Sequence, residues 1–276
     1  MSNPRHQIFH ALHQRGNPFV LVNVWDVGTA RMMEALGAQA IATSSAAFAY
    51  TLGKVDGTLT REEALNHAEQ LVRVVNIPVS ADLENGYSNT PEGVAETVRL
   101  AAEVGLSGVS IEDTCLPTDT AYPFDVAVER IGAAAEAVRA LKRDFVLVAR
   151  ADGLMTGAYD CDEAMRRCAA FERAGANCLY APLLPFAELA TFCASTACPI
   201  NALVAGENTQ RTREEFAAIG VARLSLGNSL ARVTHRLMHD AGKAMLDAGD
   251  FSVLKDTIAT DVVDTLMTQV PYDRNG

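Results

Sequence analysis

IPVSADLENG (77–86) and GVSIEDT (108–114) are the two stretches that decide the fold. Each begins with an apolar run of strand length and ends in acidic residues. The segment between them, PEGVAETVRLAAEVG (91–105), has the apolar periodicity of an amphipathic helix. Apolar runs that do not alternate with polar residues are typical of parallel strands in a covered sheet. The two stretches therefore predict a strand, a helix and a second, parallel strand.

The same alternation of apolar runs and helical segments extends over most of the chain. Eight runs have strand character: FVLVNV (19–24), AIATS (40–44), IPVSAD (77–82), GVSIED (108–113), FVLVAR (145–150), CLYAP (178–182), INALV (200–204) and ARLSL (222–226). Several helices between them begin at a capping signal, at Thr60, Thr90 and Thr212, and several end at a glycine. Eight such units in 276 residues predict an α/β fold, the (β/α)₈ TIM-type barrel.

An open, doubly wound parallel sheet is the competing architecture. It is disfavoured because the first turn after a strand, NVWDVGTA (23–30), has no Gly-x-Gly-x-x-Gly phosphate motif. We assign residues 1–226 to the barrel core and residues 227–276 to a C-terminal helical segment of the same domain. The long helix predicted at 228–249 follows the eighth unit, and we expect it to pack on a neighbouring subunit of a homo-oligomer.

The composition excludes several functional classes. A net charge of −11 and a pI of about 5.0 give a field that repels nucleic acid and anionic membrane surfaces. The sequence has no apolar stretch of about eighteen residues and no signal-peptide pattern, so we expect a cytoplasmic protein without a membrane partner. A small anionic substrate would also be repelled, so binding it requires a local cation, either a metal or an arginine.

The cysteines and histidines form no catalytic motif. The six cysteines have no Cys-x-x-Cys or zinc spacing and mostly apolar neighbours, so we expect reduced, mostly buried thiols. His6, His10 and His13 follow helical spacing near the N-terminus, and His235 and His239 do so near the C-terminus. We expect these histidines to lie on solvated helix faces.

Acidic residues gather at the predicted carboxyl ends of the strands, where a barrel of this kind has its active site. Asp82 and Glu84 are two residues apart, so on an extended segment their side chains point the same way. Glu112 ends the next strand and could approach them. Three converging carboxylates repel one another unless a cation neutralises them, and an oxygen-only site is typical of Mg²⁺ or Mn²⁺. The alternative is that these acids are solvated or cap helices.

Arg150 lies at the end of FVLVAR (145–150), among these acids. A guanidinium there could bind a substrate carboxylate, or it could form a structural ion pair with Asp113 or Asp152. The segment GNS (227–229) opens the last long helix. Its free amide groups could bind an anion, or it could be an ordinary helix start.

Five stretches match a known superfamily in order and spacing. They are NVWDVGTARMMEALGAQAIATSSAAFAYTLGKVDG (23–57), VSADLENGY (79–87), GVSIEDT (108–114), VLVARADG (146–153) and LYAPLLP (179–185). Over nearly its whole length the sequence thus resembles the isocitrate lyase and phosphoenolpyruvate mutase superfamily. The resemblance implies a barrel with a domain-swapped C-terminal helix, assembly as a dimer of dimers (a homotetramer), and a Mg²⁺ site.

The resemblance also implies roles for individual residues. Asp82 matches the main metal ligand, and Glu84 and Glu112 match the carboxylates around the waters of the metal. Asp56 matches a mobile-loop carboxylate that reaches that water shell, and Arg150 matches the arginine that contacts the substrate. We therefore assign Asp82, Glu84 and Glu112 to the metal, and Arg150, Asp56 and Glu112 to catalysis. The implied substrate-binding residues are Trp25, Asp26, Ser44, Ser45, Ala46, Arg150 and Asn201, the last at the end of the seventh strand.

The chain departs from the family in one loop. The lyase branch has a Lys-Lys-Cys-Gly-His run whose cysteine acts as acid or base, whereas this chain has DTCLPTDTAYPF (113–124). Cys115 lacks the flanking Lys, Gly and His, so we expect it to be a bystander. The Pro-Lys-Thr-Asn-like run of the phosphonate-mutase branch is missing as well, although Thr118 and Thr120 leave a hydroxyl there.

The resemblance implies enolate chemistry on a small 2-oxo-acid or dicarboxylate, with Mg²⁺ or in its place Mn²⁺ as cofactor. The lyase cysteine is missing, and loss of CO₂ needs no general acid to begin. We therefore expect a carbon–carbon lyase with oxaloacetate-decarboxylase-like activity. The alternatives are a C–P bond enzyme (a phosphonopyruvate hydrolase or a carboxyphosphonoenolpyruvate mutase-like protein), an aldolase for a larger oxo-acid, and an oxo-acid-binding protein without turnover.

Overall fold

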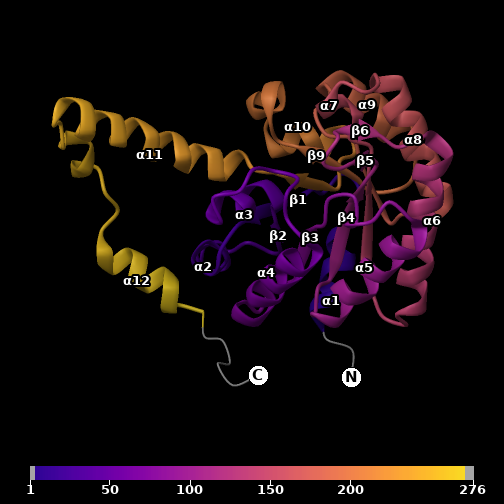
Figure 1. Ribbon diagram of the computed structural model, residues 1–276, viewed down its shortest axis with the longest axis horizontal. Coiled ribbons are helices and arrows are strands. Elements are labelled where there is room, and N and C mark those ends of the chain that lie inside the picture. The colour runs from indigo at the N-terminus through magenta and orange to yellow at the C-terminus, as the bar shows by residue number, and fades with distance from the viewer. Residues whose placement is uncertain (1–3, 271–276) are drawn as a thin grey trace.

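The computed structural model describes residues 4–270, and its centre is a closed barrel of eight parallel strands (Figure 1). The strands follow the order β1-β2-β3-β4-β7-β8-β9-β10, and β10 pairs with β1 to close the barrel. Their bounds are β1 (Phe19–Val24), β2 (Ile41–Thr43), β3 (Val79–Asp82), β4 (Gly108–Glu112), β7 (Val146–Arg150), β8 (Cys178–Tyr180), β9 (Ile200–Leu203) and β10 (Arg223–Ser225). Each predicted run forms one of these strands, so the predicted (β/α)₈ barrel is confirmed.

Most of the helices connect successive strands and surround the barrel (Figure 1). The α-helices are α1 (Pro4–Leu12), α2 (Val27–Ala35), α3 (Ser45–Thr51), α4 (Arg61–Val74), α5 (Pro91–Glu103), α6 (Phe124–Ala140), α7 (Gly153–Thr156), α8 (Cys161–Ala174), α9 (Phe186–Ser195), α10 (Arg213–Ala218), α11 (Ser229–Ala248) and α12 (Thr260–Thr268). Two 3₁₀ helices are η1 (Gly206–Gln210) and η2 (Ser252–Lys255). The predicted starts are confirmed, since Thr60, Thr90 and Thr212 each accept a hydrogen bond from the backbone N–H three residues later.

The apolar residues form two layers, one inside the barrel and one between the barrel and its helices. Alternate strand residues face opposite sides, so in β7 Val148 joins the inner layer and Leu147 the outer one. Phe9 of α1 is fully buried in the inner layer, and its ring centroid lies 6.2 Å from that of Phe19. Helix α1 therefore closes the amino-terminal end of the barrel.

The C-terminal helices lie apart from the barrel. Helix α11 extends away from it over 20 residues, and α12 returns to contact α2, where Arg31 Nε donates to Met267 O at 2.8 Å (Figure 1). On α11, Leu237 and Met238 are 65% and 71% exposed. Within residues 4–270, no helix combines the length and apolar content needed to cross a bilayer. Residues 271–276 of the predicted C-terminal segment lie outside the described residues.

Two features differ from expectation. The loop after β4 contains an antiparallel hairpin, β5 (Thr114–Cys115) with β6 (Thr120–Ala121), whose strands are too short to give a periodic signal. His6 is buried and His13 half-buried rather than solvated, and Nδ1 of His6 lies 2.9 Å from Ser107 Oγ. Burial, followed by the charge of Arg143, lowers the pKa of His6 to about 4, so this ring is neutral. The cysteines follow expectation, since four of the six are buried and all six are free.

Gly108 of β4 allows Phe9 to approach the barrel wall. An added Cβ would lie 2.8 Å from Phe9 Cε1 and 2.6 Å from Val146 O. We expect Gly108→Ala to lower the free energy of unfolding by about 1–3 kcal/mol, the usual cost of overpacking a core, as measured by urea denaturation. Gly132 of α6 has no atom within 4 Å of an added Cβ, so Gly132→Ala is the control and should stabilise by up to about 1 kcal/mol. Equal effects would contradict the packing role.

Candidate active site

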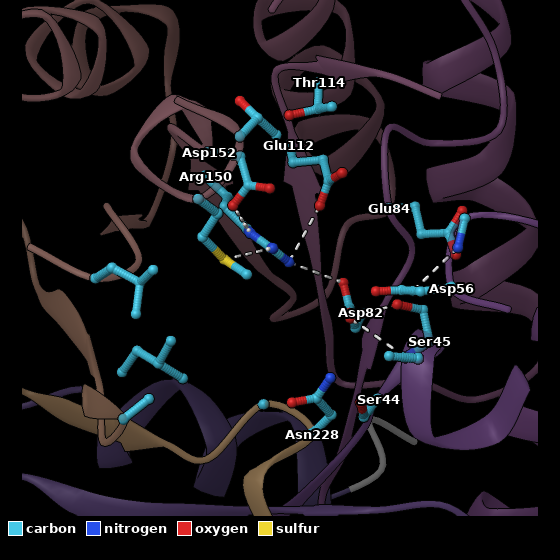
Figure 2. Close-up of a pocket in the computed structure, with 18 of the residues that line it drawn as sticks. Ser44, Ser45, Asp56, Asp82, Glu84, Glu112, Thr114, Arg150, Asp152 and Asn228 are labelled. Atoms are coloured by element: carbon cyan, nitrogen blue, oxygen red, sulfur yellow. Dashed lines mark hydrogen bonds and ion pairs between the residues drawn. The ribbon is translucent and has the colours of Figure 1, made fainter. Parts of the chain in front are cut away.

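A cavity of about 600 Å³ opens at the carboxyl end of the barrel. Strand ends and the loops after them form its wall, which consists of Ser44, Ser45, Ala46, Asp56, Gly57, Asp82, Glu84, Glu112, Thr114, Leu116, Asp119, Arg150, Asp152, Met155, Thr156, Tyr180, Leu183, Leu203, Ala205, Leu226, Gly227, Asn228, Ser229 and Arg232. Acidic side chains surround Arg150 on one side of it (Figure 2). Its size and its convergent polar groups suit a small ligand.

Arg150 is the centre of the polar side of the cavity. Its Nη1 lies 3.1 Å from Glu112 Oε2 and 3.5 Å from Asp82 Oδ1 (Figure 2). Its Nε donates to Asp152 Oδ1 at 2.6 Å. Strand register fixes this grouping, because Glu112 of β4 pairs directly with Arg150 of β7. The partner of Nη2 is a weak acceptor, Met155 Sδ at 3.5 Å.

Asp82 is held in place by hydrogen bonds to both sides of β3, to the end of β2 and the start of α3 on one side and to β4 on the other. Ser45 donates to its Oδ2 through the backbone N at 3.3 Å and through Oγ at 3.0 Å. Ser110 Oγ donates to Oδ1 at 3.4 Å, and the backbone N of Asp82 donates to Thr43 Oγ1 at 2.9 Å. Both carboxylate oxygens are therefore fixed at the end of β3.

Glu84 reaches the cavity through a turn, and the extended segment expected from the sequence is wrong. Strand β3 ends at Asp82, and Glu84 has φ +47°, in the left-handed region that residues other than glycine rarely adopt. Gly86 N donates to Leu83 O at 2.7 Å and Glu112 N donates to Glu84 O at 2.9 Å, which hold the turn. Backbone strain of this kind is often found at functional sites.

Carboxylates outnumber cations in the cavity, and their pKa values reflect it. Burial, then the charges of Asp82 and Asp56, raises the pKa of Glu84 to about 8. Burial raises the pKa of Glu112 well above its usual range despite the opposing effect of Arg150. Burial and the charge of Asp82 also raise the pKa of Asp56. The cavity therefore favours either bound protons or an added cation.

The donor set suits a hard divalent cation. The predicted metal ligands Asp82, Glu84 and Glu112 line one cavity with Asp56. Glu84 Oε1 is buried and has no hydrogen-bond partner among the described residues. The acids are not preorganised, because no group of three or more His, Cys, Asp or Glu side chains in residues 4–270 is arranged to hold a metal. Arg150 Nη1 lies between Asp82 and Glu112, so a cation would compete with it for their oxygens.

The predicted loop Ser44, Ser45 and Ala46 lines the cavity at the start of α3. Ser44 is the N-cap of this helix, and its Oγ accepts a hydrogen bond from Ala47 N at 3.3 Å. Asp56, on the loop between α3 and α4, lines the cavity as well. The structure thus brings together the Ser44–Ala46 loop, the mobile-loop acid and the three predicted metal ligands.

Trp25, Asp26 and Asn201, also predicted to bind substrate, do not line this cavity. Asp26 is the N-cap of α2, and its Oδ1 accepts from a backbone N–H of the first turn at 2.7 Å. Trp25 is half-buried, and its carbonyl oxygen lies 3.0 Å from His67 Nε2. Asn201 is fully buried and lies near the start of β9 rather than at its end, with Nδ2 donating to Ser225 Oγ at 2.8 Å. Local hydrogen bonds occupy the polar groups at these positions.

Several residues that line the cavity were not predicted from the sequence. Tyr180 ends β8, so the strand-end rule that led to Arg150 would have found it; the Arg150 Cζ lies 5.6 Å from its ring centroid. Arg232 of α11 is a second cation in the wall, beside the GNS segment (227–229) that the sequence analysis singled out. Of the two ion-pair partners considered for Arg150, Asp152 forms the pair.

The β5–β6 hairpin, where the chain departs from the superfamily that it resembles, lies beside the cavity. Thr114 lines the cavity, but Cys115 does not, and its Sγ lies 3.8 Å from Asn89 Oδ1. The hydroxyl oxygens of Thr118 and Thr120 lie 2.9 Å from each other, and neither residue lines the cavity. The hairpin hydroxyl on the cavity wall is therefore that of Thr114.

A buried guanidinium joins two strand ends behind the cavity. Arg130 of α6 is 1% exposed and donates to Glu112 O at 3.3 Å, to Ser88 O at 2.9 Å and to Asn85 O. These carbonyls belong to the end of β4 and to the segment that follows Glu84. Arg130 therefore fixes the position of the Glu84 turn relative to Glu112.

The raised pKa of Glu84 predicts how stability depends on pH in the presence of EDTA. The folded state favours the protonated carboxyl, so its stabilising contribution is complete below about pH 4.5 and is lost as the pH rises towards 8. Glu84→Gln removes this titration. We expect the melting temperature of the wild type, relative to that of Glu84→Gln, to fall between pH 5 and pH 8.5. Parallel curves for the two proteins would show that Glu84 is ionised throughout.

The sequence and the fold of this chain are similar to those of known proteins. The family model for phosphoenolpyruvate phosphomutase matches residues 9–246. A solved structure from Burkholderia cenocepacia J2315, provisionally described as a lyase/mutase, is 38% identical, with a TM-score of 0.91 and 96% of each chain covered. An oxaloacetate decarboxylase of Ectopseudomonas mendocina (strain ymp) is 31% identical over 224 residues, covering 77% of this chain and 74% of its own.

A further relative is an uncharacterized protein of Mycobacterium tuberculosis, 31% identical over 225 residues, which cover 80% of this chain and 81% of the relative. The family match extends over the whole barrel, from α1 into α11. The chain therefore belongs to the phosphoenolpyruvate phosphomutase family.

Proposed function

We propose that this protein is a divalent-metal-dependent carbon–carbon lyase that decarboxylates oxaloacetate, or a closely related 2-oxo-acid, through an enolate. The observation that carries the proposal is the grouping of Arg150 with the half-buried Asp82 and the buried acids Glu84 and Glu112 at the carboxyl end of the barrel. The 31% identity to an oxaloacetate decarboxylase supports the choice of substrate.

The acids would hold the metal. Asp82, Glu84 and Glu112 are the proposed ligands, with Asp56 beside them in the same wall. Mg²⁺, or Mn²⁺ in its place, would supply a Lewis acid that polarises the carbonyl of the substrate. The support for this assignment is the chemistry of the donors, which are carboxylate oxygens, and the unpartnered buried oxygen Glu84 Oε1.

Arg150 would bind and stabilise the reacting group. A substrate carboxylate is a much better acceptor for its Nη2 than Met155 Sδ, its present partner. When CO₂ leaves, the electron pair of the broken C–C bond moves into the carbonyl, and negative charge develops on the enolate oxygen. The guanidinium of Arg150 and the backbone amide of Ala46, in the first turn of α3, would stabilise that charge. The enolate carbon then takes a proton from water to give pyruvate.

Decarboxylation is favoured over the other reactions of the superfamily because it does not require a catalytic side chain from the β5–β6 hairpin. It needs no general acid to begin, and Cys115 does not line the cavity. The alternative, a C–P bond enzyme, would need the hydroxyl of Thr118 or Thr120 to contact the substrate. These two hydroxyls are hydrogen-bonded to each other. The non-catalytic alternative is a protein that binds oxo-acids and does not convert them.

The test is Mg²⁺-dependent release of pyruvate from oxaloacetate. We expect Asp82→Ala to fall to the rate that free Mg²⁺ gives alone, because it removes the ligand at the centre of the site. Glu62→Ala, which removes an exposed carboxylate of α4, should keep the wild-type rate and is the matched control. If the wild type is no faster than Asp82→Ala, the decarboxylase proposal is wrong. Phosphonopyruvate turnover, or tight oxo-acid binding without product, would then identify the alternatives.

We also propose that helix α11 of the C-terminal segment packs against the barrel core of a second copy in a dimer of dimers. The support is the apolar face of α11, where Val233, Leu237 and Met238 are more than half exposed. A monomer that leaves such a helix face in water is unfavourable, and a second copy is a simple way to cover it. Neither nucleic acid nor membrane is a proposed partner.

Assembly can be tested at α11. We expect Leu237→Glu to shift the protein to a smaller species in sedimentation velocity, because it places a charge in the proposed interface. Lys243→Gln, on the exposed side where Lys243 Nζ lies 3.1 Å from Asp247 Oδ2, is the control and should leave the species unchanged. A wild type that sediments as a monomer would refute the proposal.

A further inference from the structure

Arg223 of β10 is a charged side chain in the core of the barrel. It is 3% exposed, and its Nε donates to Asn201 Oδ1 at 2.8 Å, while Asn201 donates in turn to Ser225. Its Nη1 has no hydrogen-bond partner among residues 4–270. Arg223 also takes part in none of the ion pairs formed within that part of the chain, unlike Arg150 and the buried Arg167.

A buried guanidinium without a counter-ion is costly, since a charge removed from water needs compensation. Burial lowers the pKa of Arg223, and the groups that most oppose this shift are Cys178 and Tyr180, which are neutral at neutral pH. Its charge is felt nearby, because after burial it is the next cause that lowers the pKa of His13 to about 3. These two neighbours of Arg223 therefore supply no full negative charge, and the acidic residue in the wall of the cavity that Arg223 lines is Asp82.

Arg223 lines a small cavity of about 40 Å³ inside the barrel. Hydroxyl side chains from two other strands, Ser80 of β3 and Ser110 of β4, line the cavity with it, as does Ser225 of β10 itself. This inner cavity adjoins the floor of the active site, because the two share the wall residues Asp82, Arg150, Tyr180 and Gly227.

We propose that the inner cavity binds one monatomic anion of the halide class, with Arg223 as its counter-ion. One water molecule needs about 10–15 Å³ of such space, so the inner cavity, at about 40 Å³, has room for a single small ion. The guanidinium offers charge-assisted donors, and the hydroxyls of Ser80 and Ser225 can rotate to donate as well.

Asp82 does not remove the need for this anion. Its Oδ2 accepts from Ser45, and its Oδ1 faces Ser110 and Arg150, so its charge is already directed to other donors. A water molecule would accept a hydrogen bond from Arg223 Nη1 but would leave the positive charge uncompensated. The inference uses neither the substrate nor the metal, so it is independent of the proposed lyase activity.

Bromide is the probe, because it scatters X-rays anomalously and is similar to chloride in size. Crystals of the full chain grown with sodium bromide should show an anomalous peak within hydrogen-bond distance of Arg223. Arg223→Met removes the charge with little change in length and should abolish the peak. Arg236→Met, at an exposed arginine of α11, should keep it. A water without anomalous signal at Arg223 in the wild type would overturn the proposal.

A second measurement needs no variant and remains decisive if Arg223→Met does not fold. The melting temperature of the wild type is followed in millimolar sodium bromide and in sodium gluconate, whose anion is too large for the cavity. Above the Kd of the site, each tenfold rise in bromide should raise the folding equilibrium constant up to tenfold, with no such rise in gluconate. Identical melting temperatures in the two salts at every concentration would overturn the proposal. A folded Arg223→Met protein should show no bromide dependence.

Discussion

Concentrated negative charge at one end of the barrel is the constraint on which the rest of the site depends. Parallel register places Glu112 opposite Arg150, and the end of β3 brings Asp82 beside them. All barrel strands are parallel and end at the same rim of the barrel, so the backbone keeps these side chains close together. Arg150 forms three ion pairs in response, with Asp82, Glu112 and Asp152, yet the pKa values of Glu84 and Glu112 remain raised.

Hydrogen bonds from neighbouring residues hold the acids in place against this repulsion. Ser45 fixes one oxygen of Asp82, and Arg130 holds the backbone around Glu84 and Glu112 from behind. Both supports act through hydrogen bonds that leave the acids in place without neutralising them. The acids thus stay close together while their charge remains uncompensated, so an added cation would lower the electrostatic energy of the site.

The sequence was sufficient for the barrel and for much of the rim. Apolar runs of strand length separated by helical periodicity located all eight strands, because burial on both faces leaves a strong local pattern. Once the strands were placed, parallel direction alone put Asp82, Glu112 and Arg150 at one end. Tyr180 was available to the same rule and was overlooked.

The remaining features depend on contacts between distant segments, which no local pattern records. Arg130 donates a hydrogen bond to a carbonyl oxygen 45 residues away in the sequence. The residues of the N-terminal helix contain no signal that Phe9 packs inside the barrel. Glu84 adopts a left-handed backbone that its side chain gave no reason to expect. Asn201 matched a strand-end position by resemblance, but β9 continues to Leu203, so the amide lies deeper in the barrel.

Helix α1 gives the barrel a further property, because a tube closed at its floor has a single opening. Whatever enters the cavity must leave past the same rim, between the loop that carries Asp56 and the β5–β6 hairpin with Thr114. Arrival and departure are then consecutive events on one path. The rim loops thereby govern the residence time of every occupant as well as its admission, and selectivity and turnover are set by the same few residues.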